Sequence, residues 1–174
     1  NVLAGARQTE FSAVRYGNVL GSRGSVIPYF LDKAKTGSIP ITDERMTRFW
    51  LTIQEGVQFV LDSFERMHGG EIFVPKIPSF KVMDVARVVC PGIPTHVVGI
   101  RPGEKLHEVM ITEDDAHSTY EFEKYFAIIW CMRERERELF ITNLPYAGSR
   151  VGQSAGQEKG GTRGHTLVLQ SKKS

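Results

Sequence analysis

Three turn-rich segments of the 174-residue sequence carry arginines that could bind phosphate groups. They are Arg15 to Ser25 (RYGNVLGSRGS), Arg45 to Trp50 (RMTRFW) and Arg101 to Lys105 (RPGEK). A guanidinium group can donate two parallel hydrogen bonds to a phosphate and stays charged at physiological pH. We therefore expect arginines from the three segments to converge on a substrate that contains a diphosphate. No stretch of the sequence matches G-x-G-x-x-G, the loop that holds a dinucleotide pyrophosphate.

Other kinds of catalytic site have weaker support in the sequence. The adjacent acids Asp114 and Asp115 fall in a polar stretch, which favours a solvated turn over acid–base chemistry. Two segments match Tyr-x-x-x-Lys, one from Tyr29 to Lys33 and one from Tyr120 to Lys124. The five histidines lack the spacing of a metal site, so we expect no metal.

The composition is that of an ordinary globular protein, with 41% hydrophobic residues and a net charge of +2. Acidic and basic residues are interleaved, which argues against a nucleic-acid partner. We find no apolar run of about 20 residues and no signal peptide, so we expect no membrane association. Cys90 and Cys131 form no C-x-x-C unit and indicate a reducing compartment, so we expect a cytoplasmic location.

The first arginine-rich segment lies between an expected strand and an expected helix. Glu10 to Tyr16 alternates aromatic and branched residues with polar ones, which predicts a strand. Ser25 is a candidate cap for a helix that ends near Ala34, before Gly37. The loop from Gly21 to Gly24 therefore leads into a helix N-terminus. It could hold an anion there, or it could be a solvated turn.

A second helix is predicted by a capping box, in which Thr52 and Glu55 satisfy each other's backbone N–H groups. Apolar residues follow at the helical period, so we expect this helix to pack into the core. Glu71 to Lys76 reads as a strand. The apolar positions of the helix are Ile53, Val57, Val60, Leu61, Phe64 and Met67.

The sequence changes character after Trp130. Arg133 to Glu138 (RERERE) has no apolar stripe, and the stretch from Ala147 to Gly164 is rich in Gly, Ser, Gln and charged residues. We therefore divide the chain into a folded part, 1–130, and a divergent tail, 131–174, which we expect to be disordered from about Asn143.

Four segments in one order resemble the carboxyl-terminal half of the inverting UDP-N-acetylglucosamine 4,6-dehydratases. They are RYGNVLGSRGSVIPYF, PITDERMTRFWLTIQEGVQFVL, GGEIFVPKIPSFKVMDVA and GIRPGEKLHEVM, between about Thr9 and Phe126. These enzymes are extended short-chain dehydrogenases/reductases (SDRs) and act in surface-glycan biosynthesis. The resemblance implies an α/β fold. We expect an incomplete Rossmann-like NAD(P)-binding fold, with its later strands and a small substrate-binding subdomain.

The resemblance also implies the chemistry, which is that of a hydro-lyase. Bound NADP oxidises the sugar of UDP-N-acetylglucosamine at C4, water leaves across C5 and C6, and the hydride returns to C6 with inversion at C5. The protein positions the sugar and moves protons, while NADP carries the hydride. The residues implied to bind substrate are Asn18, Thr42, Arg48, Arg101 and Glu104, and those implied to lie alongside the nicotinamide are Val19, Leu20, Gly21, Ser22 and Arg23.

Each of these roles has a structural alternative. Asn18 could be present simply because it tolerates a left-handed turn conformation after Gly17. Arg48 could form a surface ion pair with Asp43 or Glu44, and Arg101 could do no more than brace Glu104. By the same resemblance, the acid–base group and the catalytic Tyr-x-x-x-Lys pair belong upstream of residue 1. The two matches to that motif in this chain are then coincidences.

The expected behaviour of the chain follows from these gaps. We expect at most weak UDP-sugar binding and no turnover, and an exposed strand edge or apolar patch. The full-length enzyme is expected to be a homo-oligomer. Two alternatives stay open, which are a stand-alone UDP-sugar binding module and a related UDP-sugar epimerase or dehydratase.

Overall fold

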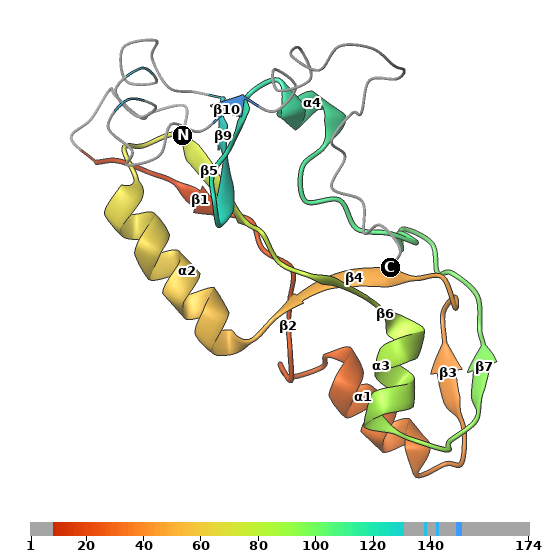
Figure 1. Ribbon diagram of the computed structural model, residues 1–174. Helices are drawn as coiled ribbons and strands as arrows, with labels where there is room; N and C mark the ends of the chain where they lie inside the picture. Colours follow the sequence, from red (N-terminus) through yellow and green to blue (C-terminus); the bar gives the residue numbers. More distant parts are fainter. Residues whose placement is uncertain (1–8, 131–137, 139–141, 143–148, 151–174) are drawn as a thin grey trace. The chain divides into compact units, whose positions relative to one another are not determined.

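A computed structural model describes residues 9–130, 138, 142, 149 and 150 of the chain (Figure 1). These residues form two compact units. The first unit contains residues 9–16, 57–76 and 110–130 with the four described residues that follow, and the second contains 17–56 and 77–109. Most of the predicted tail, 131–174, lies outside the described residues. None of the described helices is long and apolar enough to cross a membrane.

The first unit contains a five-stranded sheet. Its strands lie in the order β1 (Ala13–Val14), β5 (Glu71–Pro75), β9 (Tyr125–Ile129), β8 (Thr119–Glu121) and β10 (Ser149–Arg150). β1 runs parallel to β5, and the other neighbours are antiparallel. The strand predicted over Glu71 to Lys76 is therefore confirmed. The strand predicted over Glu10 to Tyr16 is shorter, because only Ala13 and Val14 pair with β5.

A buried carboxylate lies at the start of β5. Glu71 is fully buried and accepts hydrogen bonds from the backbone N–H groups of His68, at 2.6 Å, and Gly69, at 3.0 Å. The hydroxyl of Ser12 donates to the same carboxylate. Gly69 and Gly70 both adopt positive φ in this turn, a conformation that glycine adopts at little cost. Glu71 thus fixes the turn between α2 (Ile53–Arg66) and β5.

Arg15 and Asp115 form an ion pair within the first unit. The guanidinium of Arg15 donates to Asp115 Oδ2 at 2.7 Å and to the carbonyl of Met110 at 3.0 Å. Asp115 also accepts from the N–H of Thr112, which is the N-cap of α4 (Glu113–Ala116), and the two residues form a capping box. Burial alone would raise the pKa of Asp115, but the hydrogen bonds from Thr112 and Arg15 outweigh burial and lower it. The expectation of a solvated Asp115 is therefore wrong, and Arg15 has a structural partner.

The capping box of α2 is confirmed. The Thr52 N–H donates to Glu55 at 2.7 Å, and the Glu55 N–H donates to the Thr52 hydroxyl at 3.2 Å. The hydrogen bonds from the backbone N–H and the hydroxyl of Thr52 lower the pKa of Glu55, because they favour its ionised form.

Most of the apolar stripe predicted for α2 is exposed, contrary to the prediction that it packs into the core, and only Met67 packs as predicted. Its members Ile53, Val57, Val60, Leu61 and Phe64 are between 43% and 73% exposed. The neighbouring face of the helix, which contains Gly56 and Ser63, is buried instead. Phe59 and Met67, the residue that follows the helix, pack on the cluster of Phe73, Tyr120, Phe122, Tyr125, Ala127 and Ile129. The separate expectation of an exposed apolar patch agrees with this finding.

We expect this stripe to make the chain self-associate, because contiguous apolar surface is removed from water when two copies meet. Replacing Leu61 and Phe64 together with glutamate should shift the particle size seen by light scattering toward the monomer at the same concentration. Val88→Glu is the matched control, since Val88 is 80% exposed in the second unit and stands outside the stripe. Equal scattering by the wild-type chain and the double variant would contradict this expectation.

The second unit is built from two small sheets and two helices. β2 (Asn18–Val19) pairs parallel with β4 (Thr47–Leu51), which pairs antiparallel with β6 (Ser79–Lys81). The other sheet is the parallel pair β3 (Ile39–Ile41) and β7 (Thr95–Val97). α1 (Val26–Ala34) and α3 (Val82–Val89) lie next to each other and pack on β3 (Figure 1).

Candidate functional site

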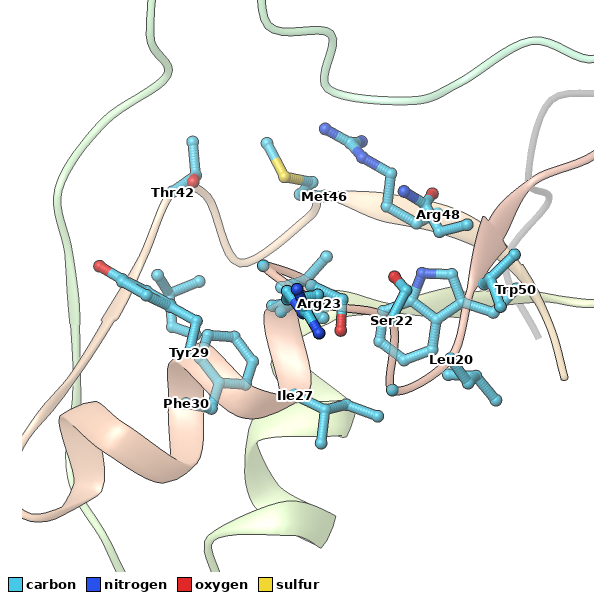
Figure 2. Close-up of a pocket in the computed structure, with 18 of the residues that line it drawn as sticks. Leu20, Ser22, Arg23, Ile27, Tyr29, Phe30, Thr42, Met46, Arg48 and Trp50 are labelled. Atoms are coloured by element: carbon cyan, nitrogen blue, oxygen red, sulfur yellow. The ribbon is translucent and has the colours of Figure 1, made fainter. Parts of the chain in front are cut away.

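A cavity of about 500 Å³ lies within the second unit (Figure 2). Its volume falls within the range of small-molecule sites. The wall is formed by β2 and the loop after it, the first turns of α1, the end of β3, β4, the start of α3 and the Arg101–Glu104 turn. The residues that line it are Asn18, Val19, Leu20, Gly21, Ser22, Arg23, Gly24, Ser25, Val26, Ile27, Tyr29, Phe30, Pro40, Ile41, Thr42, Met46, Arg48, Trp50, Val82, Arg101 and Glu104.

Every residue predicted to bind substrate or cofactor lines this cavity. The structure therefore brings Asn18, Thr42, Arg48, Arg101 and Glu104 together, although they are up to 86 positions apart in sequence. It also places the loop from Val19 to Arg23 in the same wall. This convergence is the geometric requirement for the binding site that the resemblance implies.

The backbone of Gly17 positions the first wall of the cavity. A side-chain Cβ at Gly17 would lie 2.2 Å from the carbonyl oxygen of Phe49, so only glycine allows β2 to approach β4 this closely. Asn18 then pairs with Trp50, and the N–H of Leu20 donates to the carbonyl of Leu51 at 2.9 Å. Asn18 is thus a strand residue fixed beside β4, and not the turn residue of its structural alternative.

The loop after β2 leads into α1 as predicted, but Ser25 does not cap the helix through its side chain. Its hydroxyl oxygen is buried and forms no hydrogen bond with the described residues, while its carbonyl accepts from the Tyr29 N–H at 3.3 Å. The Ser25 backbone is extended, so the residue still marks the start of the helix. Val26 and Ile27 of the first turn line the cavity.

Arg48 extends from β4 and is held by groups around the cavity. Its guanidinium donates to the carbonyls of Thr47, at 2.8 Å, and Leu106, at 3.3 Å. Its Nη2 is 3.7 Å from Glu104, and its Nε is 3.9 Å from Glu108. The side chain is only 13% exposed. These contacts fix the position of the positive charge beside the cavity.

The proposed pairing of Arg48 with Asp43 or Glu44 is not what the described residues show. Asp43 is instead paired with Arg45, whose guanidinium donates to Asp43 Oδ1 at 3.0 Å and to Asp43 Oδ2 at 2.8 Å. The hydrogen bonds from Arg45 lower the pKa of Asp43 to about 2. Arg45 is therefore committed to a local ion pair and does not line the cavity.

Arg101 and Glu104 form a turn at the cavity wall. The Arg101 N–H donates to Glu104 Oε2 at 3.3 Å, and the Glu104 N–H donates to the Arg101 carbonyl at 3.0 Å. Arg101 thus braces Glu104 through its backbone, and its side chain is exposed. The charged residues of the wall are the arginines 23, 48 and 101 and a single acid, Glu104. This excess of positive charge favours an anionic ligand.

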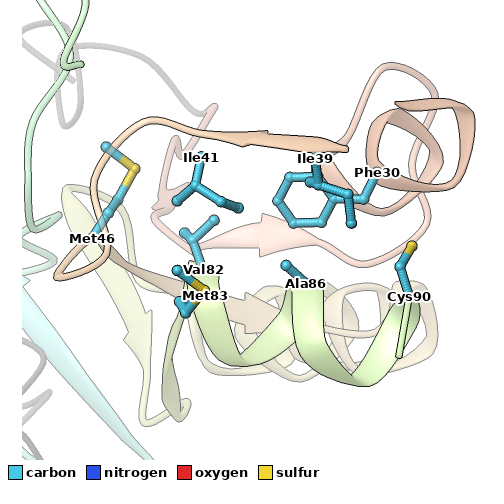
Figure 3. Packing of buried hydrophobic residues seen from close by; sticks show 8 residues of the cluster. All are labelled: Phe30, Ile39, Ile41, Met46, Val82, Met83, Ala86 and Cys90. Carbon is cyan, nitrogen blue, oxygen red and sulfur yellow. The ribbon is translucent and has the colours of Figure 1, made fainter. Parts of the chain in front are cut away.

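An apolar cluster supports the cavity (Figure 3). Phe30, Ile41, Met46 and Val82 line the cavity and also belong to this cluster. Its other members are Ile39, Met83, Ala86 and Cys90, all of them buried. The wall is therefore continuous with the core of the second unit, and close packing limits its movement.

Sequence reasoning missed the aromatic residues of the wall, Tyr29, Phe30 and Trp50. In the sequence, Tyr29 is only part of a Tyr-x-x-x-Lys match that the resemblance makes a coincidence. In the structure, the Nζ of Lys33 from the same match lies 5.7 Å from the Tyr29 ring centroid. No group of three His, Cys, Asp or Glu side chains that could hold a metal ion occurs within the described residues.

Residues 1–129 match the family described as polysaccharide biosynthesis proteins. The chain belongs to this family. It is 53% identical over 155 residues to a UDP-N-acetylglucosamine 4,6-dehydratase (inverting) of Campylobacter jejuni, an alignment that covers 87% of this chain and 46% of the relative. The chain thus spans about half the length of that relative. The resemblance inferred from the sequence is confirmed.

More distant relatives carry other names. The chain is 38% identical over 128 residues to the capsular polysaccharide biosynthesis protein CapD of Staphylococcus aureus, which covers 68% of this chain and 21% of the relative. It is 34% identical over 126 residues to a UDP-glucose 4-epimerase of Rickettsia conorii. This alignment covers 70% of this chain and 37% of the epimerase. The relatives of this chain are therefore named for at least two different reactions, a dehydration and an epimerisation.

A solved structure, Pen from Bacillus thuringiensis, matches the fold with a TM-score of 0.68 and 32% identity. The match covers 74% of this chain and 42% of Pen. Together with the parallel pairs β1–β5, β2–β4 and β3–β7, this similarity confirms the predicted α/β class with part of a Rossmann-like fold.

Proposed function

We propose that this chain is the sugar-nucleotide-binding part of a UDP-N-acetylglucosamine 4,6-dehydratase that acts in polysaccharide biosynthesis. The observation that carries the proposal is the convergence of Asn18, Arg48 and Arg101 on one cavity, in a chain 53% identical to such an enzyme. In this assignment Arg48 and Arg101 bind the diphosphate, because guanidinium groups suit phosphate oxygens, and the Arg48 guanidinium is already held in place beside the cavity. Asn18 contacts the sugar, Glu104 the ribose and Thr42 the uridine.

NADP is the cofactor that we propose for the complete site. When bound, it would supply hydride transfer at the sugar. The loop from Val19 to Arg23 fits a contact with the nicotinamide end, since Val19 and Leu20 give it an apolar part that lines the cavity. The chain contains no G-x-G-x-x-G loop for the pyrophosphate, so we expect no turnover of UDP-N-acetylglucosamine by these 174 residues alone.

Calorimetric titration of the chain with UDP-N-acetylglucosamine tests the proposal. Arg48→Met should weaken binding about 10- to 100-fold, because a charge-assisted contact to phosphate is lost. Arg101→Met should weaken it about 10-fold without lowering the melting temperature, since the Arg101 side chain is exposed. Arg45→Met is the matched control and should bind normally, because Arg45 pairs with Asp43 and neither residue lines the cavity. Absence of binding by the wild-type chain would refute the proposed function.

A related UDP-sugar enzyme is the second candidate, because the chain is also 34% identical to a UDP-glucose 4-epimerase. The titration separates the two candidates when it is repeated with UDP-glucose. Tighter binding of UDP-N-acetylglucosamine favours the dehydratase, and tighter binding of UDP-glucose favours the epimerase. A parallel titration with NADP separates an enzyme part from a stand-alone binding module, which would bind the sugar nucleotide alone.

A further inference from the structure

Tyr29 presents the accessible aromatic surface of the cavity. Three aromatic residues line the wall, and two of them are committed to packing. Phe30 is 2% exposed, and Trp50 is 6% exposed and packs against Phe80 with a ring-centroid distance of 6.2 Å. Tyr29 is 39% exposed. A planar ligand group that enters the cavity can therefore reach the Tyr29 ring, whereas the other two rings are covered.

The Tyr29 ring is held by its neighbours in α1. It follows Pro28, and its centroid lies 6.2 Å from that of Phe30, which is anchored in the core cluster. Lys33, one turn later, places its ammonium group 5.7 Å from the ring centroid, within the range of a cation–π contact. Tyrosine also has few rotatable bonds, so ordering its ring on a ligand costs little conformational entropy.

The position of Tyr29 relative to the arginines indicates which part of a ligand it would meet. In Figure 2, Tyr29 and Thr42 lie to one side of Arg23, and Trp50 and Leu20 lie to the other. The Thr42 hydroxyl forms no hydrogen bond with any described residue, so it is available to a ligand. A sugar nucleotide carries its base and its sugar on opposite sides of the diphosphate. If the arginines hold the phosphates, the base and the sugar extend to different parts of the wall.

We propose that Tyr29 stacks against the nucleobase of the sugar nucleotide and makes this end of the cavity selective for a nucleotide over a simple sugar phosphate. The inference rests on the proposed function and adds a specificity-determining residue to it. Every base has a π-face, and stacking on a protein aromatic ring contributes substantially to binding. The edge of the base would then face Thr42, whose hydroxyl can donate or accept a hydrogen bond.

Binding of three ligands to the full chain tests this proposal. UDP-N-acetylglucosamine contains the base, the diphosphate and the sugar, UDP lacks the sugar, and N-acetylglucosamine 1-phosphate lacks the base. Tyr29→Leu should weaken UDP-N-acetylglucosamine and UDP about 10-fold each and leave N-acetylglucosamine 1-phosphate unchanged. Tyr29→Phe and Tyr29→Trp should bind UDP as the wild type does, because both keep an aromatic face. Tyr16→Leu is the control, since Tyr16 is 42% exposed in the first unit and does not line the cavity.

Three results would overturn the stacking role. In the first, Tyr29→Leu binds UDP normally while Arg48→Met binds it weakly, so the proposed function survives and the stacking does not. In the second, Tyr29→Leu weakens UDP and N-acetylglucosamine 1-phosphate equally, which would mean that Tyr29 acts on the phosphates or on the fold. In the third, the wild-type chain binds neither UDP nor UDP-N-acetylglucosamine, and the proposed function fails as well. If Tyr29→Leu melts without cooperativity, and so does not fold properly, Tyr29→Phe and Tyr29→Trp still test the stacking role. Weak UDP binding by either of these aromatic variants would then contradict it.

Discussion

Replacing Gly17 with alanine is expected to destabilise the second unit by about 3 kcal/mol and to abolish measurable UDP-N-acetylglucosamine binding. The added Cβ would lie 2.2 Å from the Phe49 carbonyl oxygen and 2.7 Å from the Phe49 Cβ, so the two backbones must separate. Separation breaks the pairing of β2 with β4, including the hydrogen bond from Leu20 to Leu51. Asn18 and the loop after it would then leave the cavity wall.

Chemical denaturation followed by tryptophan fluorescence measures this loss, because Trp50 lies in the strand that β2 contacts. Gly56→Ala is the matched control. Gly56 lies inside α2, and a Cβ there would meet only the flexible end of Leu51 at 3.4 Å. Alanine also favours the helix over glycine by about 1 kcal/mol, so this variant should be neutral or more stable. A Gly17→Ala variant with wild-type stability would show that β2 can shift without cost.

Replacing Glu71 with glutamine is expected to destabilise the first unit by about 3 kcal/mol. The carboxylate is fully buried and accepts from two backbone N–H groups and the Ser12 hydroxyl. An amide of the same shape has one acceptor oxygen, and its NH₂ group would face a donor. At least one buried donor is then left unsatisfied, and the turn at Gly69 and Gly70 loses a contact that fixes it.

Urea denaturation at neutral pH would measure this effect. Glu65→Gln should leave the midpoint unchanged, because Glu65 is exposed on α2. Ser12→Ala should cost about 1 kcal/mol, since it removes one of the three donors and leaves the carboxylate with the two N–H groups. Equal midpoints for Glu71→Gln and the wild type would mean that the buried carboxylate contributes nothing to the turn.

Local signals in the sequence predicted α1 and α2, but not α4. The Thr52–Glu55 capping box and the 3.6-residue period place α2 within a residue or two of its observed limits, because both are properties of neighbouring residues. The Tyr29 ring was not recognised as part of the site. Its exposure depends on how Phe30 and Trp50 are buried by distant elements, which a local pattern does not report.

The partners of charged and apolar groups were harder to predict for the same reason. Arg15 pairs with Asp115, 100 positions later, and Arg48 is held by Glu104 and Glu108 rather than by the nearer Asp43. The 3.6-residue period of α2 shows which residues share one face of the helix, but not which elements pack against that face. Most of the stripe was therefore wrongly assigned to the core. Guanidinium chemistry alone indicated that arginines would converge, but Asn18 and Thr42 were expected in the same cavity only because four long segments resemble one family.

Among the residues that the structure describes, all those that line the cavity belong to residues 17–56 and 77–109, and none of them comes from the five-stranded sheet. Under the proposed function, a binding site carried by one unit can be inherited as a block while the chemistry carried out on its ligand diverges. The sequence similarity of this chain to proteins named as a dehydratase and as an epimerase fits such a history.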